Sequence, residues 1–376
     1  MPMYFKNGKL FTGSGWQLGN FEVTASGKFG KIFSDVPADA VDLQGAKVIP
    51  GLVDVHIHGA MGADFSDGDY EGLKKMAQYL LKEGVTAFTP TSMTLPYHVL
   101  RKAFAVGKML SEEDPADCSR LMGVHMEGPY FSEKKKGAQN GAYLKDPDLE
   151  GFRALQESCS DFIKIVDVAP ELPGTIDFIK GAKQLCTVSI AHTDADYDHA
   201  KAAIDAGVTH LTHLFNAMPG IHHRSPGVIP AAAENPDVRA ELICDGIHVH
   251  PASVRLAFQI FGADRMVLIS DALRCCGMPE GEYELGGQVV YLHGSVGHLI
   301  DGTIAGAVTN LYEDMRRAIQ FGISEADAIR AATINPAKAI GAADKIGSIE
   351  NGKYADFIVC SDDYTQKRVF KGGIEI

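Results

Sequence analysis

The feature that most constrains the fold is a regular alternation of strand-like and helix-like patterns through the middle of the chain. Several of the strand-like runs are apolar on both faces, which is typical of parallel strands that are covered on two sides. The eight runs are 49–57, 85–91, 121–126, 162–168, 186–191, 208–214, 240–244 and 266–270. Helical patterns lie between them, as in 70–84, where apolar residues recur at helical spacing and Gly84 follows as a stop signal.

Eight strands that alternate with helices predict an α/β fold, a (β/α)8 TIM barrel. The alternative is an open doubly wound sheet, but no GxGxxG or Walker A sequence supports nucleotide binding in such a sheet. Both ends of the chain instead show short β segments with glycine punctuation. We therefore predict a small β-sandwich domain built from residues 1–50 plus 346–376, beside a catalytic barrel of residues 51–345.

Composition excludes several classes of function. The chain has 376 residues, and 35 Lys and Arg against 48 Asp and Glu give a net charge of −13, which disfavours nucleic acid as a partner. No apolar run approaches the roughly 20 residues that span a membrane, and the N-terminal segment lacks the apolar stretch of a signal peptide. Seven scattered Cys suit reduced thiols. We expect a cytoplasmic protein that binds neither membrane nor nucleic acid.

Side chains capable of chemistry fall where the predicted strands end, which is where barrel enzymes carry their catalytic groups. The first run ends in VDVHIHG (53–59), so His56 and His58 project to one face and form half of a metal site. Further ionisable side chains end the third, fifth, sixth and eighth runs, namely Glu127, His192, His213 and Asp271. A single histidine at such a position is usually a satisfied polar residue, but this combination predicts a metal centre.

This set resembles the amidohydrolase superfamily, with HxH on strand 1, a His on each of strands 5 and 6, and an Asp on strand 8. Many members carry a lysine on strand 4, but here that run ends in VAPE (168–171), and Glu127 can supply the missing anionic ligand. Other segments closely resemble N-acetylglucosamine-6-phosphate deacetylases over nearly the whole chain: HMEGPYFSEKKKGAQN (125–140), THLFNAM (212–218), HHRSPG (222–227), DGIHV (245–249), SDA (270–272), GTIAGA (302–307) and GSIENGKYADFIV (347–359).

The resemblance implies a two-metal centre. One ion would be held by Glu127, His192 and His213, and a second by His56 and His58, with Glu127 and a hydroxide bridging the two. Imidazole and carboxylate ligands suit Zn²⁺, so we expect two Zn²⁺ per subunit, while Fe²⁺, Mn²⁺ and Co²⁺ are compatible with the same ligands.

The implied reaction is metal-dependent hydrolysis of the acetamide of N-acetylglucosamine 6-phosphate to glucosamine 6-phosphate and acetate. Metal-bound hydroxide attacks the carbonyl, and Asp271 acts as general base and then as general acid to the leaving amine. The alternatives are the galacto epimer of this substrate, or another amidohydrolase reaction on a cyclic amide or an N-acyl amino acid. A scaffold without catalytic activity is disfavoured, because every expected ligand is present.

The resemblance also implies how a phosphorylated amino sugar is bound. Arg224 is the natural partner of the phosphate, together with Asn216 and the backbone amide of Ala217. His248 is similar to a substrate-binding histidine of the family, and Gln139 stands where one branch carries a histidine that contacts substrate. Some phosphate contacts in the family come from a second subunit, so we expect a homodimer with its sites near the subunit interface.

Overall fold

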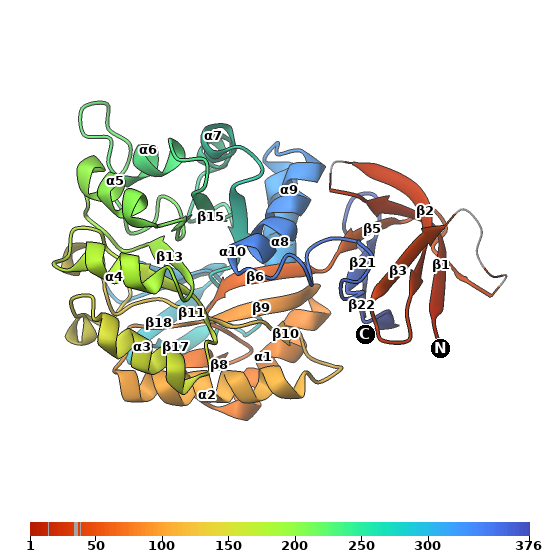
Figure 1. The fold of residues 1–376 in the computed structure, drawn as a ribbon, viewed down its shortest axis with the longest axis horizontal. Coiled ribbons are helices and arrows are strands. Elements are labelled where there is room, and N and C mark those ends of the chain that lie inside the picture. Colours follow the sequence, from red (N-terminus) through yellow and green to blue (C-terminus); the bar gives the residue numbers. More distant parts are fainter. Residues whose placement is uncertain (14, 34–36, 38) are drawn as a thin grey trace.

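A computed structural model describes residues 1–376 except 14, 34–36 and 38. Within the continuously described residues 39–376, eight parallel strands form the predicted barrel (Figure 1). They are β6 (Leu52–Ile57), β9 (Val85–Ser92), β11 (Val124–Met126), β12 (Ile163–Val168), β13 (Thr187–Ile190), β14 (His210–Leu211), β15 (Arg239–Ile243) and β16 (Met266–Ile269). The N–H of Asp271 donates to the carbonyl of His56 at 2.9 Å, which brings the last strand back to the first. The barrel prediction is confirmed, and the open sheet is wrong.

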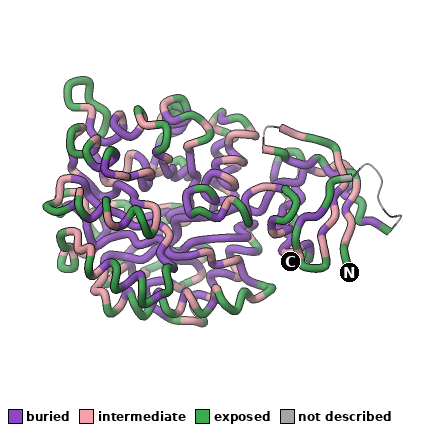
Figure 2. Tube along the Cα trace, in the orientation of Figure 1, coloured by how far each residue is buried: buried purple, intermediate pink, exposed green. Residues whose placement is uncertain are grey.

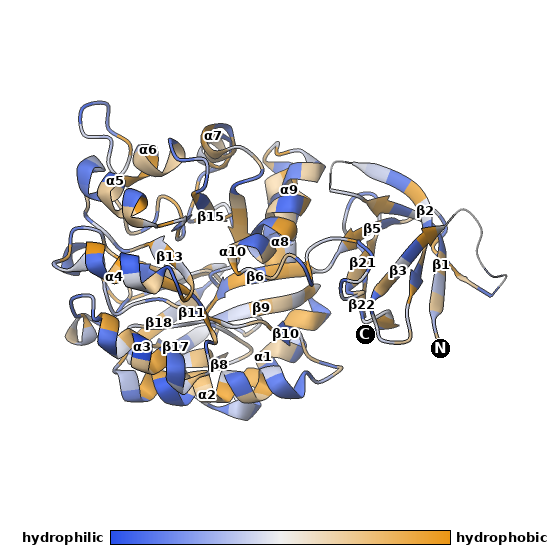
Figure 3. Cartoon of the chain, in the orientation of Figure 1, coloured by the Kyte–Doolittle hydropathy of each residue, from blue (hydrophilic) through white to orange (hydrophobic). Residues whose placement is uncertain are grey.

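Helices cover the outside of the barrel, and most of them bury one side and expose the other (Figures 2 and 3). In α1 the side chain of Asp69 accepts the N–H of Gly72 and starts the helix, and Gly84 follows its end with φ of +94°. The helices are α1 (Tyr70–Lys82), α2 (Tyr97–Glu113), α3 (Leu149–Ser158), α4 (Thr175–Ala182), α5 (Tyr197–Ala206), α6 (Val228–Ala233), α7 (Pro251–Phe261), α8 (Leu311–Gln320), α9 (Glu325–Ala331) and α10 (Ile334–Ala339). No helix in the described ranges is both long and apolar enough to span a membrane.

Two of the predicted strands are each divided into two strands in the structure. The run 49–57 is divided at Gly51, because β5 (Lys47–Pro50) belongs to the sheet of the termini and only β6 belongs to the barrel. A side chain at Gly51 would collide with Thr86, so the crossing between the two sheets requires glycine there. The run 121–126 is likewise divided into β10 (Arg120–Leu121), which pairs with β9, and β11.

Strands from both ends of the chain form a separate sheet, as predicted, and both termini lie in it (Figure 1). Besides β5, its strands are β1 (Met3–Phe11), β2 (Trp16–Val23), β3 (Phe29–Phe33), β4 (Val41–Asp42), β21 (Phe357–Cys360), β22 (Lys367–Lys371) and β23 (Ile374–Glu375). Antiparallel pairing of β5 with β21 joins the N-terminal strands to the C-terminal strands. Phe5 packs against Phe21, Phe357 and Phe370 at ring distances of 5.0–5.7 Å, which gives this sheet its own core. The limits predicted for the two domains stay a prediction.

Short elements complete the end of the barrel where the strands terminate. An antiparallel sheet follows strand β16 and consists of β17 (Gly281–Leu285), β18 (Gln288–His293), β19 (Val296–His298) and β20 (Ile304–Gly306). A two-stranded ribbon, β7 (Gly59–Ala60) with β8 (Ala63–Asp64), follows β6. Three single turns of helix are η1 (Phe65–Asp67), η2 (Glu133–Lys135) and η3 (Gly141–Tyr143).

Candidate metal and substrate site

The predicted metal ligands meet at the carboxyl ends of the barrel strands. His192 and His213 follow β13 and β14, and Asp271 follows β16, each just beyond the last residues of its strand. All three have left-handed backbones, with φ of +45°, +28° and +47°. Residues with side chains rarely adopt this conformation, which costs about 1–3 kcal/mol each and occurs most often at functional sites. The strain turns the chain, so that the second residue after each of these three strands contributes its side chain to the same cluster.

One group of three buried residues could hold a metal ion, and it consists of Glu127, His192 and His213. The Nε2 atoms of both histidines lie 3.2 Å from Oε1 of Glu127 and 3.1 Å from each other. His192 donates its Nδ1–H to the carbonyl of Lys135 at 2.8 Å, which leaves Nε2 free to act as a ligand. Two imidazole nitrogens and one carboxylate oxygen directed at a common point are the ligands that Zn²⁺ prefers.

A second group consists of His56, His58 and Glu127. Nε2 of His58 lies 3.4 Å from Oε2 of Glu127 and 3.4 Å from Oδ1 of Asp271. Nε2 of His56 lies 3.6 Å from both carboxylates, is buried, and has no hydrogen-bond partner among the described residues. A buried nitrogen without a partner is costly, and a bound cation would satisfy it. This group therefore fits a metal as well, and Glu127 is shared, with Oε1 nearest His56, His192 and His213 and Oε2 nearest His58.

Opposite charges perturb the titration of this cluster. Burial acts to raise the pKa of Glu127, but the hydrogen bonds from His192 and His213 hold it well below its usual range. Burial acts to lower the pKa values of His58 and His213, but hydrogen bonds with Asp271 and Glu127 respectively raise each to about 9. The cluster thus concentrates negative charge that attracts cations, either protons or metal ions.

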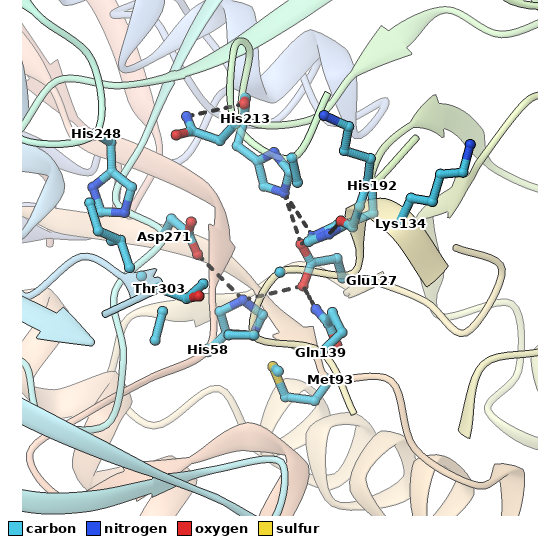
Figure 4. A pocket seen from close by; sticks show the side chains of 18 residues that line it. His58, Met93, Glu127, Lys134, Gln139, His192, His213, His248, Asp271 and Thr303 are labelled. Atoms are coloured by element: carbon cyan, nitrogen blue, oxygen red, sulfur yellow. Dashed lines mark hydrogen bonds and ion pairs between the residues drawn. The ribbon is translucent and has the colours of Figure 1, made fainter. Parts of the chain in front are cut away.

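Four members of the two groups, Glu127, His58, His192 and His213, line a cavity of about 280 Å³, which is large enough for a monosaccharide derivative (Figure 4). Asn216, Ala217 and His248 also line this cavity, and so do residues 303–306, which include part of β20. Lys134 and Lys135 also line the cavity. The cavity thus places polar and cationic groups within reach of a small anionic ligand.

The structure places the predicted substrate-binding residues unequally. Asn216, Ala217, His248 and Gln139 all line the cavity, whereas Arg224 does not. Nδ1 of His248 lies 2.6 Å from Oδ2 of the buried Asp245, which orients its ring. Arg224 is exposed in its loop, where its Nη1 lies 2.7 Å from Nε2 of the neighbouring His223.

Gln139 contacts a candidate metal ligand directly. It is buried, donates its amide N–H to Oε2 of Glu127 at 2.5 Å, and accepts the N–H of Thr94 at 2.8 Å. Both ends of its amide are therefore occupied by the protein. This arrangement orients Glu127, and it differs from the direct contact with substrate that the resemblance implies.

Sequence reasoning missed the buried carboxylates beneath the site. Glu241 accepts hydrogen bonds from His56 and His210, and Asp167 does the same for His125 and Thr212. Glu241 is the one carboxylic acid in the apolar run 240–244, and an acid at such a position signals a buried partner. Asp54, in contrast, accepts the hydroxyl of Ser270 and the backbone N–H of His56, and therefore fixes the strand and not the ring.

A parallel barrel with paired histidines, a shared glutamate and an aspartate at its strand ends defines a metal-dependent hydrolase. A family model described as the amidohydrolase family matches residues 47–375, and the chain belongs to this family.

Its relatives within the family are sugar-phosphate deacetylases. The N-acetylglucosamine-6-phosphate deacetylase of Bacillus subtilis (strain 168) is 38% identical over 331 residues, which cover 87% of this chain and 82% of the relative. The N-acetylgalactosamine-6-phosphate deacetylase of Escherichia coli O157:H7 is 31% identical, covering 93% of both chains. A mutant N-acetyl-D-glucosamine-6-phosphate deacetylase from Mycobacterium smegmatis, solved in complex with N-acetyl-D-glucosamine-6-phosphate, superposes with a TM-score of 0.93 at 29% identity and covers 100% of this chain and 99% of that one.

Proposed function

We propose that this protein hydrolyses the acetamide of N-acetylglucosamine 6-phosphate to give glucosamine 6-phosphate and acetate. The observation that carries the proposal is the convergence of Glu127, Asp271 and three histidines, His58, His192 and His213, at a cavity sized for a monosaccharide. The buried His56 adds a fourth imidazole, with its Nε2 3.6 Å from both carboxylates. Most of the similar proteins bear the name of the gluco enzyme, and this favours the gluco over the galacto substrate.

Two divalent ions, with Zn²⁺ as the best match, would be held by the two groups that share Glu127. Support comes from the 3.2 Å contacts of His192 and His213 with Oε1, and from the 3.4 Å contact of His58 with Oε2. When bound, such ions polarise a carbonyl and lower the pKa of water towards neutrality. Fe²⁺, Mn²⁺ and Co²⁺ prefer overlapping ligands and remain alternatives for the native metal.

Asp271 would move the protons of the reaction. Burial acts to raise its pKa, but the charges of His56 and His58 lower it below its ordinary value, so it is ionised and ready to accept a proton from the attacking water. Its Oδ1 lies 3.4 Å from Nε2 of His58 and lines the same cavity. The same carboxyl then donates the proton to the leaving amine, because an amine is a poor leaving group until it is protonated.

The phosphate and sugar would be held by polar groups of the cavity other than the proposed metal ligands. Asn216, the backbone amide of Ala217 and the imidazole of His248 would contact them, with Gln139 acting on Glu127 from the other side. Arg224 is exposed and outside the cavity of its own chain, which supports a role in a partner's site within a homodimer. The homodimer and the cytoplasmic location stay predictions.

Acetate release tests this proposal. The purified protein is offered N-acetylglucosamine 6-phosphate, the unphosphorylated sugar and N-acetylgalactosamine 6-phosphate in parallel, and acetate is quantified. We expect the highest kcat/KM for the phosphorylated gluco compound. A higher value for the galacto epimer would transfer the assignment to that substrate, and equal values with and without phosphate would contradict phosphate recognition.

A further inference from the structure

One buried carboxylate contacts a candidate ligand from each metal-binding group. Glu241 lies in β15, inside the barrel and beneath the cluster, and its side chain is 0% exposed. Its Oε2 accepts the Nδ1–H of His56 at 2.9 Å and the main-chain N–H of His213 at 3.2 Å. Its Oε1 accepts from Nε2 of His210 at 3.0 Å.

The contact with His56 determines which nitrogen of that ring can bind a metal. A carboxylate can only accept hydrogen bonds, so Nδ1 must carry the proton and Nε2 must hold the free lone pair. Nε2 is the atom that faces Glu127 and Asp271, each at 3.6 Å. A histidine ligand commonly donates its other N–H to a carboxylate, which fixes the tautomer and strengthens the metal bond.

The contact with His213 acts on the other group. The backbone of His213 has φ of +28°, and the hydrogen bond from its N–H to Glu241 helps to hold it in this strained conformation. The main-chain carbonyl of Glu241 also accepts the N–H of Leu214 at 2.9 Å. The chain is therefore fastened to β15 on both sides of the bend that aims the His213 ring at the cavity.

We propose that Glu241 is a positioning residue for both metal sites: it sets the form of His56 that binds through Nε2 and fixes the bend at His213. The inference rests on the two-metal centre of the proposed function and adds a residue to it. Removal of Glu241 is expected to weaken the metal held by His56 most, because that contact is made through the ligand's own ring.

Asp167 of strand β12 is a second buried carboxylate inside the barrel and offers a matched control. It is also 0% exposed, and its Oδ1 accepts from Nε2 of His125 at 3.1 Å and from the hydroxyl of Thr212 at 2.9 Å. Neither partner belongs to the two groups that share Glu127, although His125 belongs to a third possible group with His56 and Glu241. A purely structural effect of neutralising a buried carboxylate should therefore appear equally in Asp167→Asn and Glu241→Gln.

The experiment measures metal affinity of the stripped protein. Zn²⁺ binding to wild type, Glu241→Gln and Asp167→Asn is followed by competition with a chromophoric chelator, and the absorption spectrum is recorded after loading with Co²⁺. We expect two ions per chain in wild type and in Asp167→Asn. In Glu241→Gln we expect the affinity for the ion held by His56 to fall about 10–100-fold, and we expect the Co²⁺ spectrum to change.

A second variant keeps the proposal testable if Glu241→Gln does not fold. Glu241→Asp keeps the charge but shortens the side chain by one methylene, so its carboxylate loses the reach to His56, and we expect a loss of affinity in the same direction. Unchanged affinities and spectra in both Glu241 variants would overturn the proposal, as would an equal loss in Asp167→Asn. A wild type that holds only one ion would also overturn it, whereas acetate release by the same preparations would test the proposed function separately.

Discussion

Asp271 is the residue on which the chemistry depends most directly, because the proposed metal ligands can bind ions but cannot deliver a proton to the amine. Replacement by asparagine keeps the size of the side chain and removes its basicity. We expect Asp271→Asn to lower kcat for acetate release by about 10²–10⁴-fold. Metal content, measured on the same samples, should stay at the wild-type value, because all of the proposed metal ligands remain. A variant that kept most of its kcat would remove Asp271 from the proton transfer.

The side chains that end the strands could be predicted from the sequence, because position alone brings them together in a barrel. His56, His192 and His213 are the clearest examples, and all three reach the cluster. The role of Gln139 could not be predicted, because its contact with Glu127 depends on the path of the loop 127–140 and not on a periodic pattern. The role of Glu241 could not be predicted for a related reason, since its partners come from two other strands and contact it only when the barrel closes.

At the scale of elements, the alternating pattern predicted every barrel strand but not where each one ends. The run 208–214 contains only the two residues of β14, His210 and Leu211, as strand. Its last residues leave the strand at the bend of His213, because the ligand must turn into the cavity. Apolar character continues through such bends, since these residues are still buried. The hydropathy pattern therefore predicts which residues are buried, but it does not predict where the hydrogen bonds between strands end.

Helix α8 contains a buried carboxyl group that lowers the free energy of unfolding at neutral pH. Asp314 is 0% exposed, and among the described residues neither of its carboxyl oxygens accepts a hydrogen bond of normal geometry. Nη1 of Arg317 lies 3.7 Å from Oδ1 of Asp314. Burial, reinforced by the charge of Asp245, raises the pKa of Asp314 well above its ordinary value. The folded state therefore holds the proton more tightly than the unfolded state, and stability is lost as pH rises above the ordinary pKa.

Replacing Asp314 by asparagine should therefore stabilise the protein in a pH-dependent way. We expect the free energy of unfolding of Asp314→Asn to exceed that of wild type by about 1–3 kcal/mol at pH 8. The difference should shrink as pH falls towards the ordinary carboxyl pKa, where both side chains are neutral. Urea denaturation at pH 8 and at pH 5 measures it, and a variant less stable than wild type at pH 8 would contradict this account.

At the scale of the whole molecule, a buried ion pair ties the terminal sheet to the barrel. Arg120 of β10 donates to Asp356, which precedes β21, at 3.0 Å, and its guanidinium lies 4.1 Å from the centre of the Tyr354 ring. Asp356 is buried and also accepts the N–H of Gly372 at 2.7 Å. Since removal of one partner leaves an unpaired buried charge, we expect Arg120→Met to lower the free energy of unfolding by about 3–5 kcal/mol.

Catalysis should be unaffected by that change, because Arg120 does not line the cavity. Lys9→Met is the matched control, since Lys9 pairs with Asp362 at 3.7 Å between two exposed side chains, and such pairs contribute at most about 1 kcal/mol. Thermal or urea unfolding of both variants, with kcat measured beside it, makes the comparison. Equal losses of stability in the two variants would show that the Arg120 pair does not fasten the sheet to the barrel.

The most direct test of metal-dependent deacetylation is acetate release from N-acetylglucosamine 6-phosphate by one preparation in three states: as purified, after removal of metal by a chelator, and after Zn²⁺ is restored. Metal content is measured in each state. We predict that release disappears with the metal and returns with it, reaching its full rate as the second ion per chain is bound. Release that persists in the metal-free protein would contradict the account of this site.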